Sequence, residues 1–369
     1  MKKHFGEDKI ILLFGAGASC DAGMKNSIQM INDIELQLED KWKDYKHLYN
    51  YIQSSHYHIE RLRGLRSADI SFNIEHLVGL LNVIIDIGNR KIDLYPFIGS
   101  WEKDLLAVTG ENFTLARSFK EKILQQLKTN WLMPVSYISK SSYYGKVFDT
   151  GYTFALRIFS LNYDMCVEKN TPSHVNLERG FNDARIWDYR RYEASDRESD
   201  FFLYKLHGSL DWKRENDRLT FADATDSIEP LELEIIFGVQ NKLQSYDPYL
   251  FYFYAFREAC IKAELIIISG YGFYDKHIND NLEKAIIEDP DKKVLVNLLD
   301  FNREEEDIKK WISQKIRIKP ENLIIANKPA KDFFTNELNV NYFASLFPES
   351  DSETNILPTV NDSNEEVPM

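Results

Sequence analysis

The segment Ile10–Gly23, IILLFGAGASCDAG, decides which fold this sequence predicts. Its apolar residues run directly into Gly-Ala-Gly, a pattern typical of a buried strand that enters a tight turn. In such a turn Gly15 and Gly17 let the backbone approach a pyrophosphate, and the helix that follows near Ala18 directs its first N–H groups at the phosphates. The segment therefore predicts the first strand and turn of a dinucleotide-binding domain.

The usual dinucleotide-binding fingerprint is incomplete in this chain. A full G-x-G-x-x-G motif needs a third glycine at the position of Cys20. The acidic residue sought about 20 positions later would be Asp33 or Glu35, and both fall in a helical pattern instead of at a strand end. A plain strand-to-helix turn explains the segment equally well, so other motifs must decide between the two interpretations.

Composition narrows the class of protein. The three cysteines, Cys20, Cys166 and Cys260, lie far apart, which excludes a cysteine-rich zinc ribbon and favours a reducing cytoplasm. No apolar run approaches the roughly 18 residues of a membrane span, and no apolar segment near the N-terminus suggests a secretory signal. The formal net charge of −13 argues against general affinity for nucleic acid, so we expect neither a membrane nor a nucleic-acid partner.

Short apolar runs alternate with helical patterns over most of the chain. The predicted strands are Ile10–Phe14, Ala155–Ser160, Phe201–Leu206, Leu265–Ser269, Val294–Leu299 and Leu323–Ala326, and the predicted helices between the later ones are Pro248–Ala263, His277–Glu288 and Glu304–Lys315. Strands without clean alternation, separated by helices, indicate a parallel sheet covered on both faces. The sequence thus predicts an α/β fold with a six-stranded, mostly parallel Rossmann-like sheet.

Residues from about 25 to 150 have a different character. Apolar positions recur at helical spacing over Asp33–Gln53, Asn73–Ile87 and Phe113–Leu132, so we expect a mainly helical insertion. The predicted organisation is one domain over residues 1–345 that carries this insertion. Residues 346–369 form an acidic tail that is poor in aromatic residues, and we expect it to be disordered.

Polar residues follow two of the later predicted strands. In Phe159-Ser-Leu-Asn-Tyr-Asp164, Asn162 and Asp164 fall at the carboxyl edge of the sheet, where α/β proteins bind ligands, although either could simply cap a helix. His207, in the segment KLHGS, also follows a strand and could act as a base at cellular pH, although a lone histidine is more often structural.

A third motif, Ile268-Ser-Gly-Tyr-Gly-Phe-Tyr-Asp275, ends another strand in a glycine turn. Asp275 is placed to cap the helix that includes Asn279. Taken alone, this motif is also explained as a loop of small residues between a strand and a helix. With it, four predicted strands end in small or polar residues that would share one edge of one sheet.

The order of these motifs is more specific than any one of them. GAGAS, SLNYD, KLHGS and SGYGF, together with a possible helix start at Phe72-Asn-Ile-Glu-His, resemble the sirtuin-like family, in particular its bacterial NAD-consuming antiphage-defence branch. The resemblance extends through short islands over roughly residues 9–300. It implies that NAD is a substrate and that no metal is needed.

The resemblance also implies roles for individual residues. The phosphates and a ribose of NAD would be contacted by Gly15, Ala16, Gly17 and Ser19. The nicotinamide ribose would lie between Asn162 and Asp164, with His207 as the catalytic base. The adenosine half would lie near Ser269, Gly270 and Tyr271, with Asp300 at the adenine ribose. The predicted site therefore draws on the ends of five strands.

Two departures bear on the reaction. Where sirtuin deacylases carry Pro-Asp-Phe-Arg after the glycine loop, this chain has Met24-Lys-Asn-Ser, and the deacylases' four-cysteine zinc module is missing. Because that module supports the peptide-binding cleft, its loss counts against acyl-lysine chemistry. The expected activity is an NAD glycohydrolase that releases nicotinamide and ADP-ribose.

The resemblance further implies a regulated, cytoplasmic abortive-infection effector. Restraint would come from a homo-oligomer or from a partner such as a HerA-type ATPase or an Argonaute-type sensor. The alternatives are an NAD-dependent deacylase or ADP-ribosyltransferase, and a nucleotide-sensing subunit without turnover. The presence of both Asn162 and His207 favours an enzyme over a sensing subunit.

Overall fold

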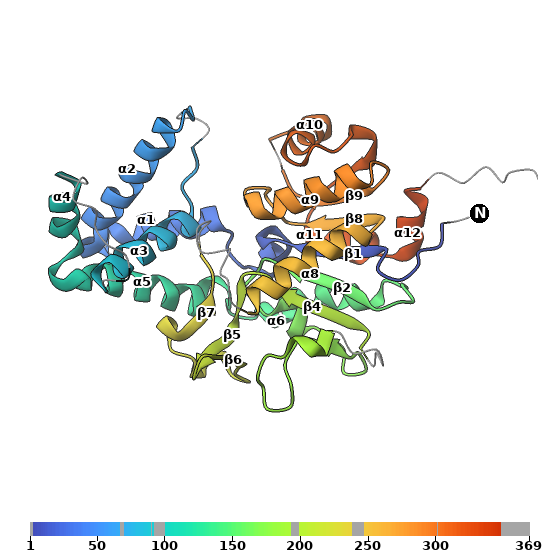
Figure 1. Cartoon of the computed structure of the whole chain (residues 1–369), viewed down its shortest axis with the longest axis horizontal. Helices are drawn as coiled ribbons and strands as arrows, with labels where there is room; N and C mark the ends of the chain where they lie inside the picture. Colours follow the sequence, from blue (N-terminus) through green and yellow to red (C-terminus); the bar gives the residue numbers. More distant parts are fainter. Residues whose placement is uncertain are drawn as a thin grey trace, which may run out of the picture.

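The computed structural model of the 369-residue chain describes residues 3–66, 70–89, 91, 100–192, 199–237, 247–300 and 302–347. Residues 348–369 of the predicted acidic tail lie outside these ranges. Figure 1 shows two parts side by side, a central sheet with its covering helices and a group of helices beside it.

The central sheet has seven strands, and all of its pairings are parallel. In spatial order they are β10 (Leu323–Asn327), β9 (Lys293–Leu298), β8 (Leu265–Ser269), β1 (Ile10–Phe14), β2 (Leu156–Ser160), β4 (Phe201–Lys205) and β3 (Leu177–Glu178). All six predicted strands are present, with ends within one residue of the prediction. The α/β prediction is confirmed, but the strand count of six was wrong: β3, with two residues, is too short to show a hydrophobic period.

The strand order fixes where a ligand can bind. Without β3, the strands stand in the order of a doubly wound dinucleotide fold, and the chain reverses direction across the sheet between β1 and β8. Ligands of such sheets bind outside the carboxyl ends of the strands at this switch point. The glycine loop after β1 and the glycine turn after β8 therefore meet at the expected place.

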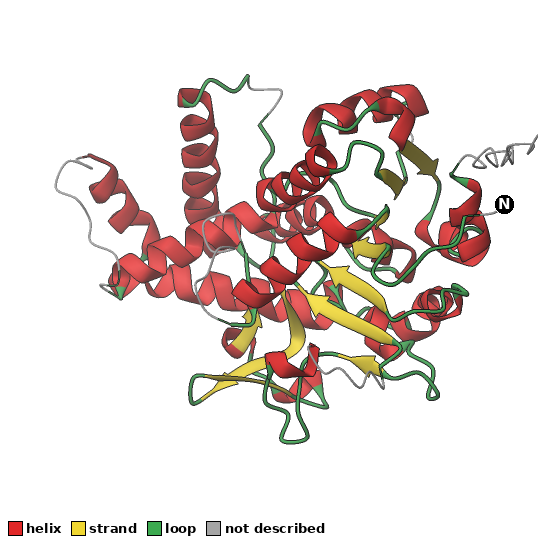
Figure 2. Ribbon diagram, turned by 45° about the vertical axis from the view of Figure 1, so that its right-hand side comes forward, coloured by secondary structure: helices red, strands yellow, loops and turns green. Residues whose placement is uncertain are grey.

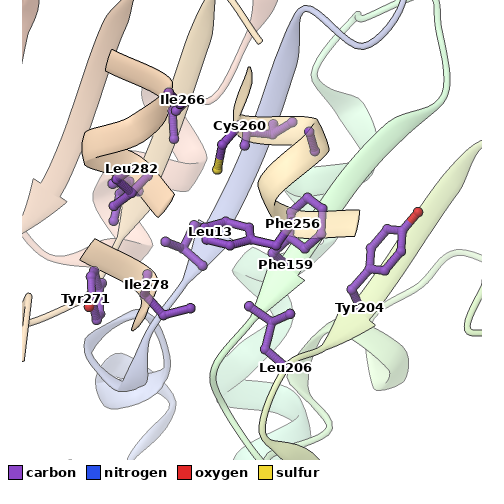
Figure 3. Close-up of a cluster of buried hydrophobic side chains, with 14 of the residues drawn as sticks. Leu13, Phe159, Tyr204, Leu206, Phe256, Cys260, Ile266, Tyr271, Ile278 and Leu282 are labelled. Atoms are coloured by element: carbon purple, nitrogen blue, oxygen red, sulfur yellow. The ribbon is translucent and has the colours of Figure 1, made fainter. Parts of the chain in front are cut away.

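Each face of the sheet packs against its own helices. On β1, Ile11 and Leu13 point into one core with α8 (Tyr249–Lys262), α9 (Lys276–Glu288) and α10 (Glu305–Ile316). Figure 3 shows Leu13 there, among side chains of β2, β4, α8 and α9. Ile10, Leu12 and Phe14 point into the opposite core, with α11 (Ala330–Asn336) and α12 (Val340–Ser345). Burial on both faces explains why the strands lack polar alternation.

In the described ranges the predicted insertion consists of helices joined by turns and loops. It contains α1 (Ser27–Leu38), α2 (Lys46–Leu62), α3 (Ile74–Gly88), α4 (Ser100–Thr109) and α5 (Thr114–Gln126), and Figure 2 shows these helices apart from the strands. The single helical pattern over Asp33–Gln53 is two helices, because the chain turns between Leu38 and Lys46. These helices share a third core, which also takes in Tyr163 and Phe237.

A second sheet was not predicted. β5 (Gly208–Glu215) pairs with β6 (Arg218–Phe221) and β7 (Leu233–Ile235), and both pairings are antiparallel. The turn between β5 and β6 is Asn216-Asp217, with φ of 49° and 61°. Two residues at positive φ are the mark of a tight hairpin, so this dipeptide is the signal that the sequence offered.

The helices of the described ranges are each too short or too polar to cross a bilayer.

Candidate active site

A cavity of about 560 Å³ lies at the carboxyl ends of β1, β2, β4, β8 and β9. Its volume is in the range of sites for small ligands and cofactors. Ten of the eleven predicted site residues line it: Gly15, Ala16, Gly17, Ser19, Asn162, Asp164, His207, Gly270, Tyr271 and Asp300. The eleventh, Ser269, is fully buried, and its hydroxyl donates to Asn297 Oδ1 at 2.8 Å. The structure thus brings together residues that come from five strand ends.

Three glycines pack two loops together at the switch point. Gly270 has a φ of +68°, and a Cβ added there would lie 1.9 Å from the backbone nitrogen of Ala18. A Cβ on Gly15 would lie 2.7 Å from the Gly270 carbonyl oxygen, and one on Gly17 would lie 2.8 Å from Gly270 Cα. Only glycine fits at these positions, so the GAG motif has a structural reason that does not involve a ligand.

The backbone N–H groups of this loop are partly engaged by the protein itself. Gly15 N donates to the carbonyl of Ser269, and Gly17 N donates to the carbonyl of Gly270, each at 2.9 Å. Ala18 N donates to Gly15 O at the start of a 3₁₀ helix, η1 (Ala16–Ala22). The prediction that this turn directs several N–H groups at a phosphate therefore needs correction, since those of Gly17 and Ala18 are already bonded.

Asn162 and Asp164 are tied to the glycine loop by side-chain hydrogen bonds. Asn162 Nδ2 donates to Gly15 O at 3.0 Å and lies 3.2 Å from Ser19 Oγ. Ser19 Oγ in turn donates to Asp164 Oδ2 at 2.7 Å. The second oxygen of Asp164 accepts the Cys166 N–H at 3.0 Å, as an Asx turn would. Asp164 therefore lies buried but hydrogen-bonded at the cavity wall.

Tyr144 supports this group from the core. Its hydroxyl lies 2.9 Å from Ser19 Oγ, and burial first, then the Tyr143 ring hydroxyl, raise its pKa well above the usual value. Tyr144 thus remains protonated and donates a hydrogen bond to Ser19, because the single hydroxyl hydrogen of Ser19 is used in its hydrogen bond to Asp164. The predicted contact residue Ser19 is 1% exposed, so its hydroxyl orients Asp164 in this structure.

Charged side chains are buried behind the site. Lys205 Nζ donates to the backbone carbonyl of Asp164, and it lies 3.7 Å from Glu168 Oε1. Arg179 pairs with Asp211 at 2.6 Å and lies 3.7 Å from Glu168. Removing one member would leave an uncompensated buried charge. The cluster fixes the loop after β2, and none of its side chains lines the cavity.

His207 lies in the turn between β4 and β5 and is 5% exposed. Its Nε2 lies 3.3 Å from Oδ2 of Asp275, which is 7% exposed and also lines the cavity. Asp275 Oδ1 accepts the His277 N–H at 3.0 Å and so caps α9, as predicted. The approach of Asp275 to His207 was not predicted, because the cap motif explained this residue completely.

The helical insertion forms the opposite wall. Asn73 caps α3 in a capping box with His76, which confirms the helix start at Phe72-Asn-Ile-Glu-His, and Asn73–His76 line the cavity. Lys25–Met30, at the start of α1, do the same. Glu75 is the residue that sequence reasoning missed here. The pKa of Tyr163 is raised well above its usual value, mainly by burial and then by the charges of Glu75 and Asp275.

The cavity end near β9 holds Asp300. Its Oδ1 accepts the Asn302 N–H at 2.8 Å and its Oδ2 accepts Arg303 Nε at 2.6 Å. Partial burial opposes ionisation, yet these donors hold the pKa of Asp300 below its usual range. The Arg303 guanidinium lies 4.4 Å from the centre of the Trp311 ring. The carboxylate is therefore charged at neutral pH and turned toward protein donors.

Cys20, which replaces the third glycine of the fingerprint, lines the same cavity. Burial first, then the charge of Asp21, raises the pKa of its thiol to about 11. A thiol with this pKa is protonated near neutral pH and is a poor nucleophile. Within the described ranges, no group of three or more His, Cys, Asp or Glu side chains could hold a metal ion.

The fold and the site together define the class of this protein. It is a doubly wound α/β protein with a nucleotide-sized cavity at its switch point. Residues 156–320 match the family model of the SIR2-like domain. The match confirms that this region of the chain resembles the sirtuin-like family. It includes Asn162, Asp164, His207 and Gly270 and leaves the glycine loop and the whole helical insertion outside.

Solved structures give a weaker likeness. A mutant Sir2 homologue in complex with 2′-O-acetyl ADP ribose is 11% identical, with 93% of this chain and 94% of that chain covered and a TM-score of 0.41. A Sir2 homologue in complex with NAD is 12% identical, with 94% and 98% covered and a TM-score of 0.42. No curated protein matches this chain in sequence.

Proposed function

We propose that this chain is an NAD glycohydrolase that cleaves NAD to nicotinamide and ADP-ribose. The observation that carries the proposal is the convergence of Asn162, Asp164 and His207 on one cavity at the switch point of a SIR2-like domain. A cavity that only bound a nucleotide would not need a buried histidine paired with a carboxylate.

In the proposed reaction the bond between nicotinamide and C1′ of ribose breaks, and its electron pair leaves with nicotinamide. Water attacks C1′, and His207 accepts the water proton, a step that typically contributes about 10²–10⁴-fold. The amide oxygen of Asn162 holds the water or a ribose hydroxyl, since its Nδ2 is committed to Gly15 and Ser19.

Asp164 supplies the negative charge that an oxocarbenium-like transition state needs. Its carboxylate is 4% exposed and is held by donors from Ser19 and Cys166. A preorganised charge in a water-poor site stabilises an opposite charge more strongly than the same group in water. Asp164 therefore contributes through a fixed position and does not need to move during the reaction.

A nicotinamide-release assay on the full chain tests the proposal. Wild-type protein is expected to convert NAD to equimolar nicotinamide and ADP-ribose, and His207→Ala to lose about 10²–10⁴-fold in rate. His174→Ala is the matched control, because His174 is exposed and outside the cavity. If His207→Ala kept a tenth of the rate, the base would be another group. An acylated peptide in the same assay would reveal deacylation instead.

We further propose that the activity is restrained in the cell and released in antiphage defence, because unrestrained loss of NAD would kill the host. The insertion exposes Leu36 at 70% and Leu62 at 74%, which offers apolar area to a second copy or a regulatory partner. NAD levels in phage-infected cells that carry wild type or His207→Ala test this role. Light scattering tests the oligomer.

A further inference from the structure

We propose that Asp275 is a positioning residue, which holds the imidazole of His207 in the tautomer and orientation that a general base needs. The proposal rests on the proposed glycohydrolase function. Its starting point is the 3.3 Å approach of Asp275 Oδ2 to His207 Nε2, with both side chains buried at the cavity wall.

Helix capping alone does not explain why Asp275 lies beside His207. His207 follows β4 and Asp275 follows β8, and β1 and β2 lie between these strands in the sheet. With neighbouring strands about 4.8 Å apart, the two strand ends are separated by about 14 Å. The loop from Gly270 to Asp275, the turn after β4 and the two side chains together span this distance. A cap alone could be formed directly above β8.

The two oxygens of Asp275 have separate partners. Oδ1 accepts the His277 N–H at the start of α9, and Oδ2 lies 3.3 Å from His207 Nε2. Hydrogen bonds within the loop and to α9 hold this segment in place. The Tyr271 hydroxyl lies 3.0 Å from the Asp275 carbonyl oxygen and 2.9 Å from Asn279 Oδ1. Asn279 Nδ2 donates to the carbonyl of Phe273 at 2.9 Å. The carboxylate thus has a fixed orientation.

The chemistry follows from which nitrogen is occupied. With the Nε2 proton directed at Asp275, the lone pair of His207 is on Nδ1, and Nδ1 takes the proton from the attacking water. The imidazolium that forms is stabilised by the charge of Asp275, which itself keeps no proton. The water loses one proton, its oxygen forms the bond to C1′, and nicotinamide leaves with the electron pair.

Kinetics of Asp275→Asn test the role. Asparagine is as good an N-cap as aspartate, so α9 and the urea midpoint are expected to stay unchanged. We expect kcat to fall about 10²-fold or more while KM changes less than threefold, since the base is misoriented and the cavity is not. Asp188→Asn is the control: Asp188 lies outside the cavity and accepts the Arg190 N–H at the start of a turn.

A double variant separates a role through His207 from an independent one. If Asp275 acts through the imidazole, Asp275→Asn costs nothing further in protein that already carries His207→Ala. Multiplied losses in the double variant, or a kcat for Asp275→Asn within threefold of wild type, would overturn the proposal.

A measurement without turnover keeps this proposal apart from the glycohydrolase proposal. ¹⁵N-histidine NMR, with His207 assigned among the eight histidines by its loss in His207→Ala, reports the tautomer directly. The Nε2–H form is expected in wild type and a mixture in Asp275→Ser. An unchanged tautomer in the variant would refute the pairing. Wild type that holds the tautomer but never releases nicotinamide would refute only the glycohydrolase.

Discussion

The two walls of the cavity are built differently. The sheet wall, formed by the loops after β1, β2, β4 and β8, is fixed by backbone contacts and buried polar side chains. The insertion wall, formed by the starts of α1 and α3, is held by two capping boxes, those of Asn26 and Asn73. All the residues proposed for bond cleavage come from the sheet wall, and the insertion wall contributes Glu75 and the helix starts.

The difference assigns the two walls different tasks. Transition-state stabilisation needs groups that are already in place, and the sheet wall provides them at little reorganisation cost. The helix starts of the insertion are fixed by caps, and a cap contributes only about 0.5–2 kcal/mol to stability. We infer that the sheet wall determines the chemical step and that the insertion wall determines access and affinity.

The largest expected effect is that of Gly270→Ala on the sheet wall. A Cβ there would lie 1.9 Å from Ala18 N, so the backbone of the glycine loop would have to move. The φ of +68° would also strain an alanine at this position. We expect a loss of more than about 4 kcal/mol in the free energy of unfolding, measured by urea denaturation. Gly64→Ala is the control, because Gly64 has a φ of +90° but no atom within 4 Å, and it should lose about 1–2 kcal/mol. Equal losses would mean that the close packing is unimportant.

Tyr163→Phe tests how the walls are joined. Tyr163 stands between Asn162 and Asp164, but its ring packs in the core of the insertion and its hydroxyl donates to Ile236 O at 2.8 Å. Loss of this buried hydrogen bond should cost about 1–3 kcal/mol and lower kcat severalfold. Tyr192→Phe removes a similar buried bond, to Leu203 O at 2.9 Å, away from the cavity. If both variants lost kcat equally, Tyr163 would have no special role.

The two walls also differ in how far sequence could predict them. Strands β1 and β8 were predicted to the residue, and Asn162, Asp164 and His207 were predicted at strand ends, because a buried parallel strand leaves a clear apolar run. The partners of these residues could not be predicted. Asp275 meets His207 because the loop after β8 and the turn after β4 join strand ends that are not neighbours in the sheet, and no local pattern encodes that path.

The insertion wall gave less signal. Its helices were expected, but the start of α1 at Ser27 was not, although Asn26 and Gln29 carry the capping-box pattern. Glu75 enters the cavity because α3 packs beside the sheet wall, and side-chain packing in the insertion core decides that placement. Periodicity identifies a helix face and does not say which end of the helix meets which strand.

Asn73→Ala tests the insertion wall itself. Loss of the cap of α3 should cost about 1 kcal/mol in the free energy of unfolding. Because Asn73 lines the cavity, KM for NAD is expected to rise several-fold, while kcat stays near wild type. Asn339→Ala removes a cap of the same kind from α12, outside the cavity, and should lose similar stability with no change in KM. A fall in kcat for Asn73→Ala would place chemistry on this wall.

The smallest expected effect concerns Asp300, whose pKa is held below its usual range by Asn302 and Arg303. Its contribution to stability is present at neutral pH and is lost as the pH falls through the lowered pKa. Asp300→Asn should therefore lose less than about 1 kcal/mol at pH 7, and the difference from wild type should vanish in acid once the carboxyl group is protonated in the folded protein.

Asp188 offers the matched control for this last variant. Its carboxylate accepts the Arg190 N–H and the Arg190 guanidinium in a similar turn, which lowers its pKa, and it lies outside the cavity. Asp188→Asn should show a pH dependence of the same sign with an unchanged KM. If Asp300 also binds the adenine ribose, only Asp300→Asn raises KM. An unchanged KM would make Asp300 a structural turn residue and limit the sheet wall's proposed NAD contacts to the region between the glycine loop and Tyr271.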